Sequence, residues 1–208
     1  MKRILLMVFA AAAAAWSSAQ TTYVSNLEAT THNGIYLNQE RSIARAFTTG
    51  GNEAGYVLNW AEFALGVGYD STLSVALWTS NCASPGLELV SLDAVGGNQF
   101  TPTTPLLLAA NTTYWFVLES GAPFTVGVSY AWYFSNDPLA TELDGWDLGT
   151  SSLWNHSGED WEPYAANFKF AVAASTVPVP EPATWAALLG VLVLGSAFAQ
   201  RRRAAATR

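Results

Sequence analysis

Residues 71–80 read Ser-Thr-Leu-Ser-Val-Ala-Leu-Trp-Thr-Ser, and this stretch decides the fold class. Its aliphatic side chains recur at every second position, as Leu73, Val75 and Leu77. A period of two is typical of a β-strand, because successive side chains of a strand point to opposite faces of the sheet. The stretch therefore predicts a strand that lays one aliphatic face on a core.

A second stretch, Thr113–Glu119, is apolar on both faces. Tyr114, Phe116 and Leu118 share one face, and Trp115 and Val117 share the other. This pattern predicts a central strand that is covered on both sides. Further strands bring the expected number to about seven, at Tyr56–Leu65, Gly86–Leu92, Phe124–Tyr133 and Asn167–Ala173, with a weaker one at Arg45–Thr48.

Helical periodicity is nearly absent between residues 20 and 179, where 14 glycines and seven prolines interrupt the chain. Strands with one apolar face must cover each other when no helix is available to do so. We therefore expect an all-β domain folded as a single β-sandwich, with a jelly-roll or immunoglobulin-like topology. Asn136–Pro163 is less regular and is predicted to form long loops at one end of the sandwich.

The composition sets limits on size and partners. The chain has 208 residues, of which 50% are hydrophobic, and much of that excess lies at the two ends. The middle, residues 20–179, holds 160 residues, enough for one sizeable core. It carries three basic residues against 15 acidic ones, a formal net charge of −12. Such a surface repels phosphates, which argues against binding of nucleic acid or anionic lipid.

The N-terminal segment has the features of a signal peptide for the general secretion machinery. Lys2 and Arg3 precede an apolar run of twelve residues, which is short for a membrane span. Small residues follow and end at Ala19. We therefore expect residues 1–19 to be removed and the mature chain to begin at Gln20, as the start of an extracellular domain over residues 20–174.

The C-terminal segment has the features of a membrane anchor. Residues 175–182 form a Pro-rich linker, and residues 183–200 are an apolar, uncharged stretch predicted to be a transmembrane helix. Its first 17 residues would span about 26 Å as a helix, close to the ~30 Å of a bilayer core. The basic tail, residues 201–208, belongs on the cytoplasmic side, which places the acidic middle outside.

The order of elements at this end closely resembles the PEP-CTERM sorting signal of Gram-negative bacteria. The motif residues come in the order tripeptide, apolar span and basic stop: Val179, Pro180, Glu181, Pro182, Arg201, Arg202 and Arg203. The resemblance implies processing by an exosortase near the Pro-Glu-Pro element. It also implies a membrane-anchored precursor, later placement at the cell surface or in the extracellular matrix, and association with exopolysaccharide in a biofilm. The alternative is a plain type I membrane protein with a proline stalk.

Part of the middle region is similar to extracellular choice-of-anchor domains, most closely type R. The similarity rests on Ala46–Gly50, the strand from Tyr56, the Pro85-Gly86 turn and Leu108–Trp115. It implies a surface-displayed β domain without an assigned enzymatic activity, and it contributes no site residues.

Candidate catalytic residues are sparse. The two histidines, His32 and His156, lie in no recognisable catalytic setting, and no Gly-x-Ser-x-Gly elbow is present. A zinc site would lack a cysteine pair. Carboxylates for a glycan hydrolase are available at Glu142, Asp144, Asp147, Glu159 and Asp160. We nevertheless expect no enzyme and no catalytic residue, because acidic residues on an exported protein usually serve solubility.

We also expect no cofactor and no assigned metal site, although a structural calcium is conceivable. Its oxygen ligands would come from Asp137, Glu142, Asp144, Asp147 and Asp160, but their spacing matches no known calcium loop. The single cysteine, Cys82, excludes an intramolecular disulfide and lies in a predicted loop.

The tryptophans of the irregular region suggest an alternative function. Trp146, Trp154 and Trp161 lie among acids and amides, a mixture suited to stacking against sugar rings. The competing interpretation is that these rings fill the core. The sequence thus favours a non-catalytic, exported surface or matrix protein, with a carbohydrate-binding module as the alternative and a secreted hydrolase as a weaker one.

Overall fold

The described part of the chain is built from strands. The computed structural model describes residues 20–66, 73–121, 123, 130–137, 140–149, 151–156 and 160–177. Within these residues no helix is present, and so none that has the length and apolarity for a bilayer span. In chain order the strands are β1 (Thr21–Ser25), β2 (Asn33–Tyr36), β3 (Arg41–Thr48), β4 (Tyr56–Phe63), β5 (Leu73–Asn81), β6 (Ser84–Gly96), β7 (Gln99–Pro102), β8 (Leu107–Leu108), β9 (Thr113–Ser120), β10 (Ala131–Ser135), β11 (Thr141–Glu142), β12 (Ser152–His156), β13 (Glu162–Pro163), β14 (Asn167–Phe168) and β15 (Phe170–Thr176). The predicted all-β class is confirmed.

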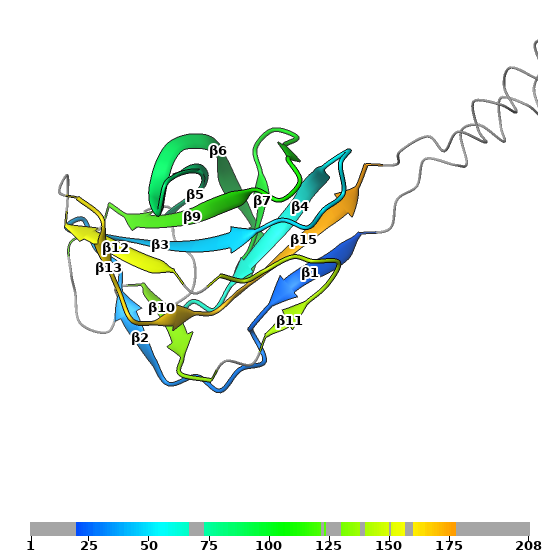
Figure 1. The fold of residues 1–208 in the computed structure, drawn as a ribbon. Coiled ribbons are helices and arrows are strands. Elements are labelled where there is room, and N and C mark those ends of the chain that lie inside the picture. The colour runs from blue at the N-terminus through cyan, green and yellow to red at the C-terminus, as the bar shows by residue number, and fades with distance from the viewer. Residues whose placement is uncertain are drawn as a thin grey trace, which may run out of the picture. The chain divides into compact units, whose positions relative to one another are not determined.

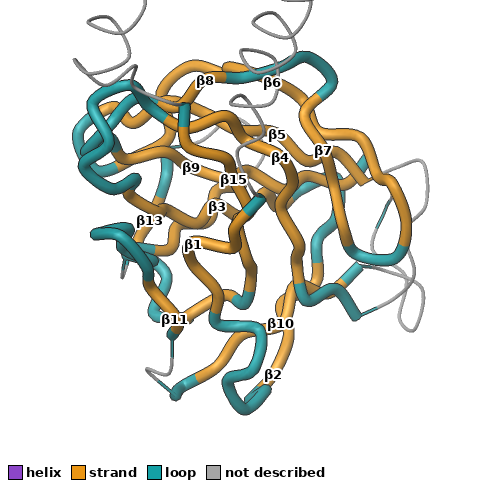
Figure 2. The backbone as a smooth tube through the Cα atoms, turned by 90° about the vertical axis from the view of Figure 1, so that its right-hand side faces the viewer, coloured by secondary structure: helices purple, strands orange, loops and turns teal. Residues whose placement is uncertain are grey.

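The strands form one large antiparallel sheet and one small one. The large sheet has the order β11-β1-β15-β4-β7-β6-β5-β9-β3-β12-β13, with β8 added beside β4. The small sheet has the order β14-β10-β2, and β10 and β2 lie together at the bottom of Figure 2. In Figure 1, β4, β15 and β1 cross behind and below β9 and β3, so the large sheet turns back on itself.

Aromatic side chains join the two halves of the large sheet. The ring of Phe170 on β15 lies 5.6 Å from that of Phe116 on β9 and 6.3 Å from that of Phe47 on β3. The ring of Phe63 on β4 lies 5.1 Å from that of Phe116. All four side chains are fully buried. The halves therefore pack face to face as the layers of a sandwich, as the sequence predicts.

The alternation in β5 and β9 has the predicted consequences. Leu73, Val75 and Leu77 are buried in the core between the layers, whereas Ser74 is exposed. β9 pairs with β5 on one side and with β3 on the other, so it is a central strand. Its two faces contribute to separate apolar clusters, one on each side of the sheet.

The predicted Asn167–Ala173 strand is in fact two strands that belong to different sheets. β14 pairs with β10 in the small sheet, and β15 pairs with β1 and β4 in the large one. The buried side chain of Asn26 holds the break: its Nδ2 donates to the carbonyl of Phe168, and its Oδ1 accepts from the N–H of Phe170. An amide side chain thus satisfies the backbone where the chain changes sheets.

The predictions for three other regions need correction. More strands are present than the seven expected, since β1 and β2 were not foreseen. The described part of the Phe124–Tyr133 prediction is β10, which runs on to Ser135. Asn136–Pro163 is not a run of loops: it contains β11, β12 and β13, and β12 pairs with β3 over five residues. Backbone pairing with a distant strand places β12 in the sheet, although its own apolar alternation is weak.

A turn within residues 140–149 buries the side chain of Trp146 in the core of the sandwich. Asp144 and Gly145 adopt φ angles of 52° and 76°, and the N–H of Trp146 donates to the carbonyl of Leu143 across this turn. The turn drives the indole ring into the core, where it stacks on Tyr23 at 4.8 Å and on Phe47 at 5.8 Å. Trp146 is only 2% exposed.

We expect Trp146→Ala to lower the free energy of unfolding by about 3–5 kcal/mol, because it empties a large buried site. Trp146→Phe should cost less, since it keeps a stacked ring and removes an indole Nε1–H that has no hydrogen-bond partner among the described residues. Urea unfolding followed by circular dichroism measures both. Leu87→Ala, at a residue that is 75% exposed, is the control and should change stability by under about 0.5 kcal/mol. Equal effects of Trp146→Ala and Leu87→Ala would contradict the packing described.

Candidate functional site

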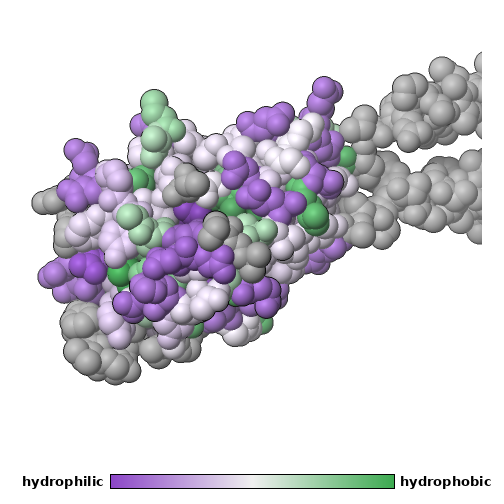
Figure 3. Space-filling model, turned by 60° about the horizontal axis from the view of Figure 1, so that its bottom comes forward, coloured by the Kyte–Doolittle hydropathy of each residue, from purple (hydrophilic) through white to green (hydrophobic). Residues whose placement is uncertain are grey.

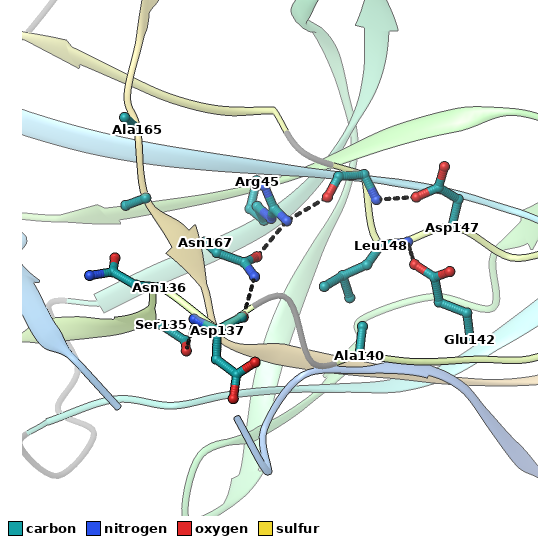
Figure 4. Close-up of a pocket in the computed structure, with 12 residues that line it drawn as sticks. Arg45, Ser135, Asn136, Asp137, Ala140, Glu142, Asp147, Leu148, Ala165 and Asn167 are labelled. Atoms are coloured by element: carbon teal, nitrogen blue, oxygen red, sulfur yellow. Dashed lines mark hydrogen bonds between the residues drawn. The ribbon is translucent and has the colours of Figure 1, made fainter. Parts of the chain in front are cut away.

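A cavity of about 450 Å³ lies on the side of the domain formed by residues 135–137, 140–149 and 165–167 (Figure 4). Its wall combines one basic residue with acids, amides and small apolar side chains. The lining residues are Arg45, Ser135, Asn136, Asp137, Ala140, Glu142, Asp147, Leu148, Gly149, Ala165, Ala166 and Asn167. The cavity therefore offers hydrogen-bond donors, hydrogen-bond acceptors and apolar surface together.

Arg45 is the central residue of this wall. It lies on β3 between Ile43 and Phe47, which share its face of the strand and belong to the core between the layers. Its Nη1 donates to Oγ of Ser152 at 3.1 Å, and its Nη2 donates to the carbonyl of Gly149 at 2.6 Å and to Oδ1 of Asn167 at 2.7 Å. One guanidinium thus ties β3 to β12, to the segment ending at Gly149 and to β14.

The charge of Arg45 is stabilised by dipoles. The side chain is 1% exposed, and no described carboxylate forms an ion pair with it. Burial lowers the pKa of Arg45 to about 10, while the nearby negative charge of Asp147 acts in the opposite direction. The guanidinium is therefore charged at neutral pH. Its Nε–H is buried and, among the described residues, has no hydrogen-bond acceptor.

Backbone N–H groups orient two carboxylates at the same cavity. Oε1 of Glu142 accepts from the N–H of Leu148 at 2.9 Å, and Oδ1 of Asp147 accepts from the N–H of Gly149 at 2.6 Å. Asp137, the third acid of the lining, lies in a turn that begins at Ser135, and its N–H donates to Oγ of Ser135. The cavity thus carries three acids around one buried cation.

The three tryptophans predicted to bind sugar do not form one surface. Trp146 is a core residue, so the prediction that its ring is presented to a ligand is wrong. Trp154 lies directly opposite Ile43 in the β12–β3 pair, on the inner face of the sheet. Trp161 packs against the cluster that contains Ala44 and Leu153, on the outer face. Because neighbouring residues of a strand point to opposite faces, Trp154 and Trp161 are separated by the sheet itself.

Trp154 belongs to a smaller cavity of about 170 Å³. The guanidinium of Arg41 lies 5.1 Å from the centre of its ring, and the ring of Tyr164 approaches it edge-on at 6.2 Å. Ile35, Ile43 and Phe168 complete this wall. One approach to the indole is therefore already taken by a cation of the protein itself.

The candidate carboxylates are only partly brought together. Glu142 and Asp147 line the larger cavity, whereas Asp144 and Asp160 are exposed outside its lining. Glu159 lies outside the described residues. The described part of the chain holds no group of three or more His, Cys, Asp or Glu residues placed to bind a metal ion. The conceivable calcium site, built from Asp137, Glu142, Asp144, Asp147 and Asp160, therefore finds no support there.

The remaining candidates are the two histidines and the single cysteine. His32 is exposed, with its ring 5.7 Å from that of Phe134, and His156 ends β12. Cys82 is exposed in the two-residue turn between β5 and β6, with a φ angle of 58°. Neither His32 nor Cys82 is among the described residues that line the two cavities.

One residue, Arg45, could have indicated the larger cavity from the sequence alone. Arg45 is one of only three basic residues between positions 20 and 179, and it occupies an inward position of a strand otherwise lined by Ile43 and Phe47. A charged residue at a core position must find polar partners inside the fold. Asn167 and Ser135 carry no comparable signal, because short polar residues are ordinary at strand ends.

We expect Arg45→Lys to lower the free energy of unfolding by about 1.5–3 kcal/mol, since the charge stays buried while the planar fork that reaches three acceptors is lost. Arg41→Lys, which changes a half-buried guanidinium over Trp154, should cost about 1 kcal/mol or less. Urea unfolding at pH 7 compares the two. If Arg45→Lys proved no more destabilising than Arg41→Lys, Arg45 would not be the joint that its bonds suggest.

The predicted processing residues lie outside the described residues, apart from Gln20, which is exposed just before β1. Those residues are Ala19, Val179, Pro180, Glu181, Pro182, Arg201, Arg202 and Arg203, and the predicted transmembrane helix at 183–200 lies outside as well. Pro178–Arg208 forms a unit separate from Met1–Val177.

Comparison with known proteins bears on this C-terminal unit. No curated protein matches the chain. The family match that was found does not extend to residues 20–177, so the similarity of the middle region to choice-of-anchor domains stays a prediction. Residues 178–203 match the family described as the PEP-CTERM protein-sorting motif, which implies export, a membrane-anchored precursor in a Gram-negative bacterium and exosortase as the processing partner.

Proposed function

We propose that this protein is an exported, non-catalytic component of the cell surface or extracellular matrix, released from a membrane-anchored precursor by exosortase. The observation that carries the proposal is the PEP-CTERM motif at residues 178–203. Its Pro-Glu-Pro tripeptide, apolar stretch and arginine cluster follow one another in the order that a processed membrane anchor requires. Association with exopolysaccharide in a biofilm is part of this proposal.

The N-terminal sequence supports the same destination. Residues 1–19 combine a basic start, an apolar run and small residues, which is the pattern of a secretory signal peptide. Cleavage after Ala19 would free Gln20, one residue before β1 begins. Removal of the segment would therefore leave every described strand intact.

The charge distribution of the domain is compatible with an exported protein. Arg45 and Lys169 are 1% and 6% exposed, and Arg41 lies against Trp154. Nζ of Lys169 donates to the carbonyl of Ala29 and to Oγ1 of Thr31. The basic side chains are thus turned inward while most acids face solvent, and hydrophobic residues form only small separate patches on the face shown in Figure 3. An acidic surface of this kind favours solubility.

The non-catalytic part of the proposal rests on the separation of the candidate groups. His32 lies just before β2 and lines neither cavity, and the backbone of His156 ends β12. The alternative of a carbohydrate-binding surface made of Trp146, Trp154 and Trp161 loses its basis, because one ring is in the core and the other two lie on opposite faces.

We expect replacement of Pro180, Glu181 and Pro182 by alanine to abolish processing, because exosortase is proposed to recognise this tripeptide. An epitope tag inserted at Gly97, in the exposed turn between β6 and β7, reports the size and fraction of the protein. The variant should keep its full length and remain in the membrane fraction, as should the wild type in cells without exosortase. Pro163→Ala, at an exposed proline of β13, is the control and should be processed normally. Processing of the triple variant would refute the sorting proposal.

We expect the mature N-terminus to be Gln20. Mass spectrometry of the N-terminal peptide from the membrane and matrix fractions measures it directly. Ala19→Arg should block cleavage, because signal peptidase requires a small residue at this position. A mature chain that retains residues 1–19 in the wild type would contradict the signal-peptide assignment.

A further inference from the structure

The Asn33-Gly34 dipeptide on β2 carries a chemical inference that goes beyond sorting and does not depend on it. It is the one place in the sequence where glycine follows asparagine. Asn33 is exposed and begins β2, a strand of four residues that pairs with β10 and with no other described strand (Figure 2). The dipeptide therefore lies at the start of a short strand on the open edge of the small sheet.

The N–H of Gly34 points toward that open edge. Gly34 lies opposite Tyr133 in the β2–β10 pair, but both backbone groups of Tyr133 are engaged elsewhere. The N–H of Tyr133 donates to the carbonyl of Ala64, and its carbonyl accepts from the N–H of Lys169. Opposite residues of an antiparallel pair alternate between hydrogen-bonded and non-hydrogen-bonded positions. Gly34 therefore occupies a non-hydrogen-bonded position, and the pairing with β10 does not use its N–H.

The side chain of Asn33 accepts this N–H instead. Oδ1 of Asn33 lies 2.9 Å from the backbone nitrogen of Gly34. A carbonyl bond is about 1.23 Å long, so the same nitrogen lies no more than about 4.1 Å from Cγ of Asn33. Reacting atoms in a near-attack arrangement are about 3–3.5 Å apart. A small rotation of the side chain therefore brings this nitrogen and Cγ to reacting distance.

Packing against Tyr133 explains why glycine occupies position 34. A Cβ atom added there would lie 2.7 Å from Cδ1 of Tyr133 and 3.2 Å from Cβ of Ala131. The aromatic ring thus covers a position of the neighbouring strand that has no room for a side chain. Glycine also leaves its own nitrogen unhindered. The fold therefore keeps the residue that makes the preceding asparagine reactive.

We infer that Asn33 converts spontaneously to aspartate and isoaspartate through a succinimide. The nitrogen of Gly34 loses its proton, and its electron pair forms a bond to Cγ of Asn33. The Cγ–Nδ2 bond breaks, and the side-chain nitrogen leaves with that proton as ammonia. One water molecule then opens the five-membered ring: attack at Cγ gives aspartate, and attack at the main-chain carbonyl carbon gives isoaspartate. No atom is oxidised or reduced, and water is the only co-reactant.

Isoaspartate at position 33 would change the course of β2. It brings the Cβ atom of that residue into the main chain, which becomes longer by one bond at the start of the strand. The N–H of His32 donates to the carbonyl of Phe134 before this point, and Ile35 pairs with Trp132 after it. The longer link shifts the register of one contact relative to the other, so we expect this end of the small sheet to loosen.

Incubation of the purified full chain in detergent at neutral pH, in heavy-oxygen water, tests this inference. Peptide mapping by mass spectrometry measures the exchange of NH for O at each asparagine, and the heavy oxygen marks conversion during the incubation. Isoaspartyl methyltransferase labels the isoaspartate product. We expect Asn33 to convert at least about tenfold faster than Asn81 and Asn111, two exposed asparagines followed by residues with a side chain. We expect its native rate to lie within about tenfold of the rate in guanidinium chloride, because an exposed strand end opens easily.

Variants assign the reaction to this dipeptide. Asn33→Gln keeps an amide but would need a six-membered ring, so product at residue 33 should fall at least about tenfold. Asn81→Gln, at an exposed asparagine of the β5–β6 hairpin, is the matched control and should leave conversion of Asn33 unchanged. Asn33→Asp supplies the charge of the product without the longer backbone. Hydrogen exchange in the peptide that contains β2 should therefore be faster in the isoaspartate form than in Asn33→Asp.

Conversion of Asn33 that is no faster than that of Asn81 and Asn111 would overturn the inference. A native rate more than about tenfold below the rate in guanidinium chloride would do the same. Equal hydrogen exchange in the isoaspartate form and in Asn33→Asp would overturn the expected loosening of β2. None of these outcomes bears on the sorting proposal, which is measured by size and cell fraction.

Discussion

Face-to-face aromatic packing is the interaction on which the rest of the domain depends. A single cysteine excludes an intramolecular disulfide, so non-covalent packing and hydrogen bonds hold the turned-back sheet. Phe116 lies 5.0 Å from Phe47, 5.1 Å from Phe63 and 5.6 Å from Phe170, which makes it the meeting point of β3, β4, β9 and β15. Each such ring pair adds about 0.5–1.5 kcal/mol to the effect of area burial. Trp146 extends this cluster to the end of the sandwich through its stacking on Phe47.

Arg45 and Lys169 are buried cations, and burying a charge in the core is energetically unfavourable. Arg45 and Lys169 are both held by neutral oxygens, and a buried charge paired only with dipoles is seldom the most stable arrangement. Their position explains why they are tolerated. Lys169 lies where the chain passes from β14 to β15, and Arg45 lies where β3, β12 and β14 meet, so their hydrogen bonds add to the apolar contacts between these elements. Polar bonding and apolar packing therefore both link the small sheet to the large one.

Local patterns predicted the fold class, but not the connections between distant segments. Periodicity identified β5 and β9 because their apolar faces are set by neighbours in the sequence. β12 was missed because its membership in the sheet comes from backbone pairing with β3, about 110 residues earlier along the chain by register. For Trp146 the sequence leaves a sugar-binding surface and a core position open, because an indole beside Asp144 and Asp147 suits either, and the turn at Asp144-Gly145 decides for the core. The walls of the Arg45 cavity come from β3, β11 and β14, which are far apart in the sequence. Local sequence patterns therefore could not predict this cavity.

The domain and the C-terminal motif divide the proposed function between them. All residues that line the larger cavity lie between Arg45 and Asn167, and β15 ends at Thr176, before the sorting motif begins at residue 178. Loss of the segment after the Pro-Glu-Pro element would therefore remove no lining residue and break no strand pair. The described walls of this cavity are therefore the same in the anchored precursor and in the released protein. Processing would then change where the domain resides, while the chemistry of its cavity stays the same.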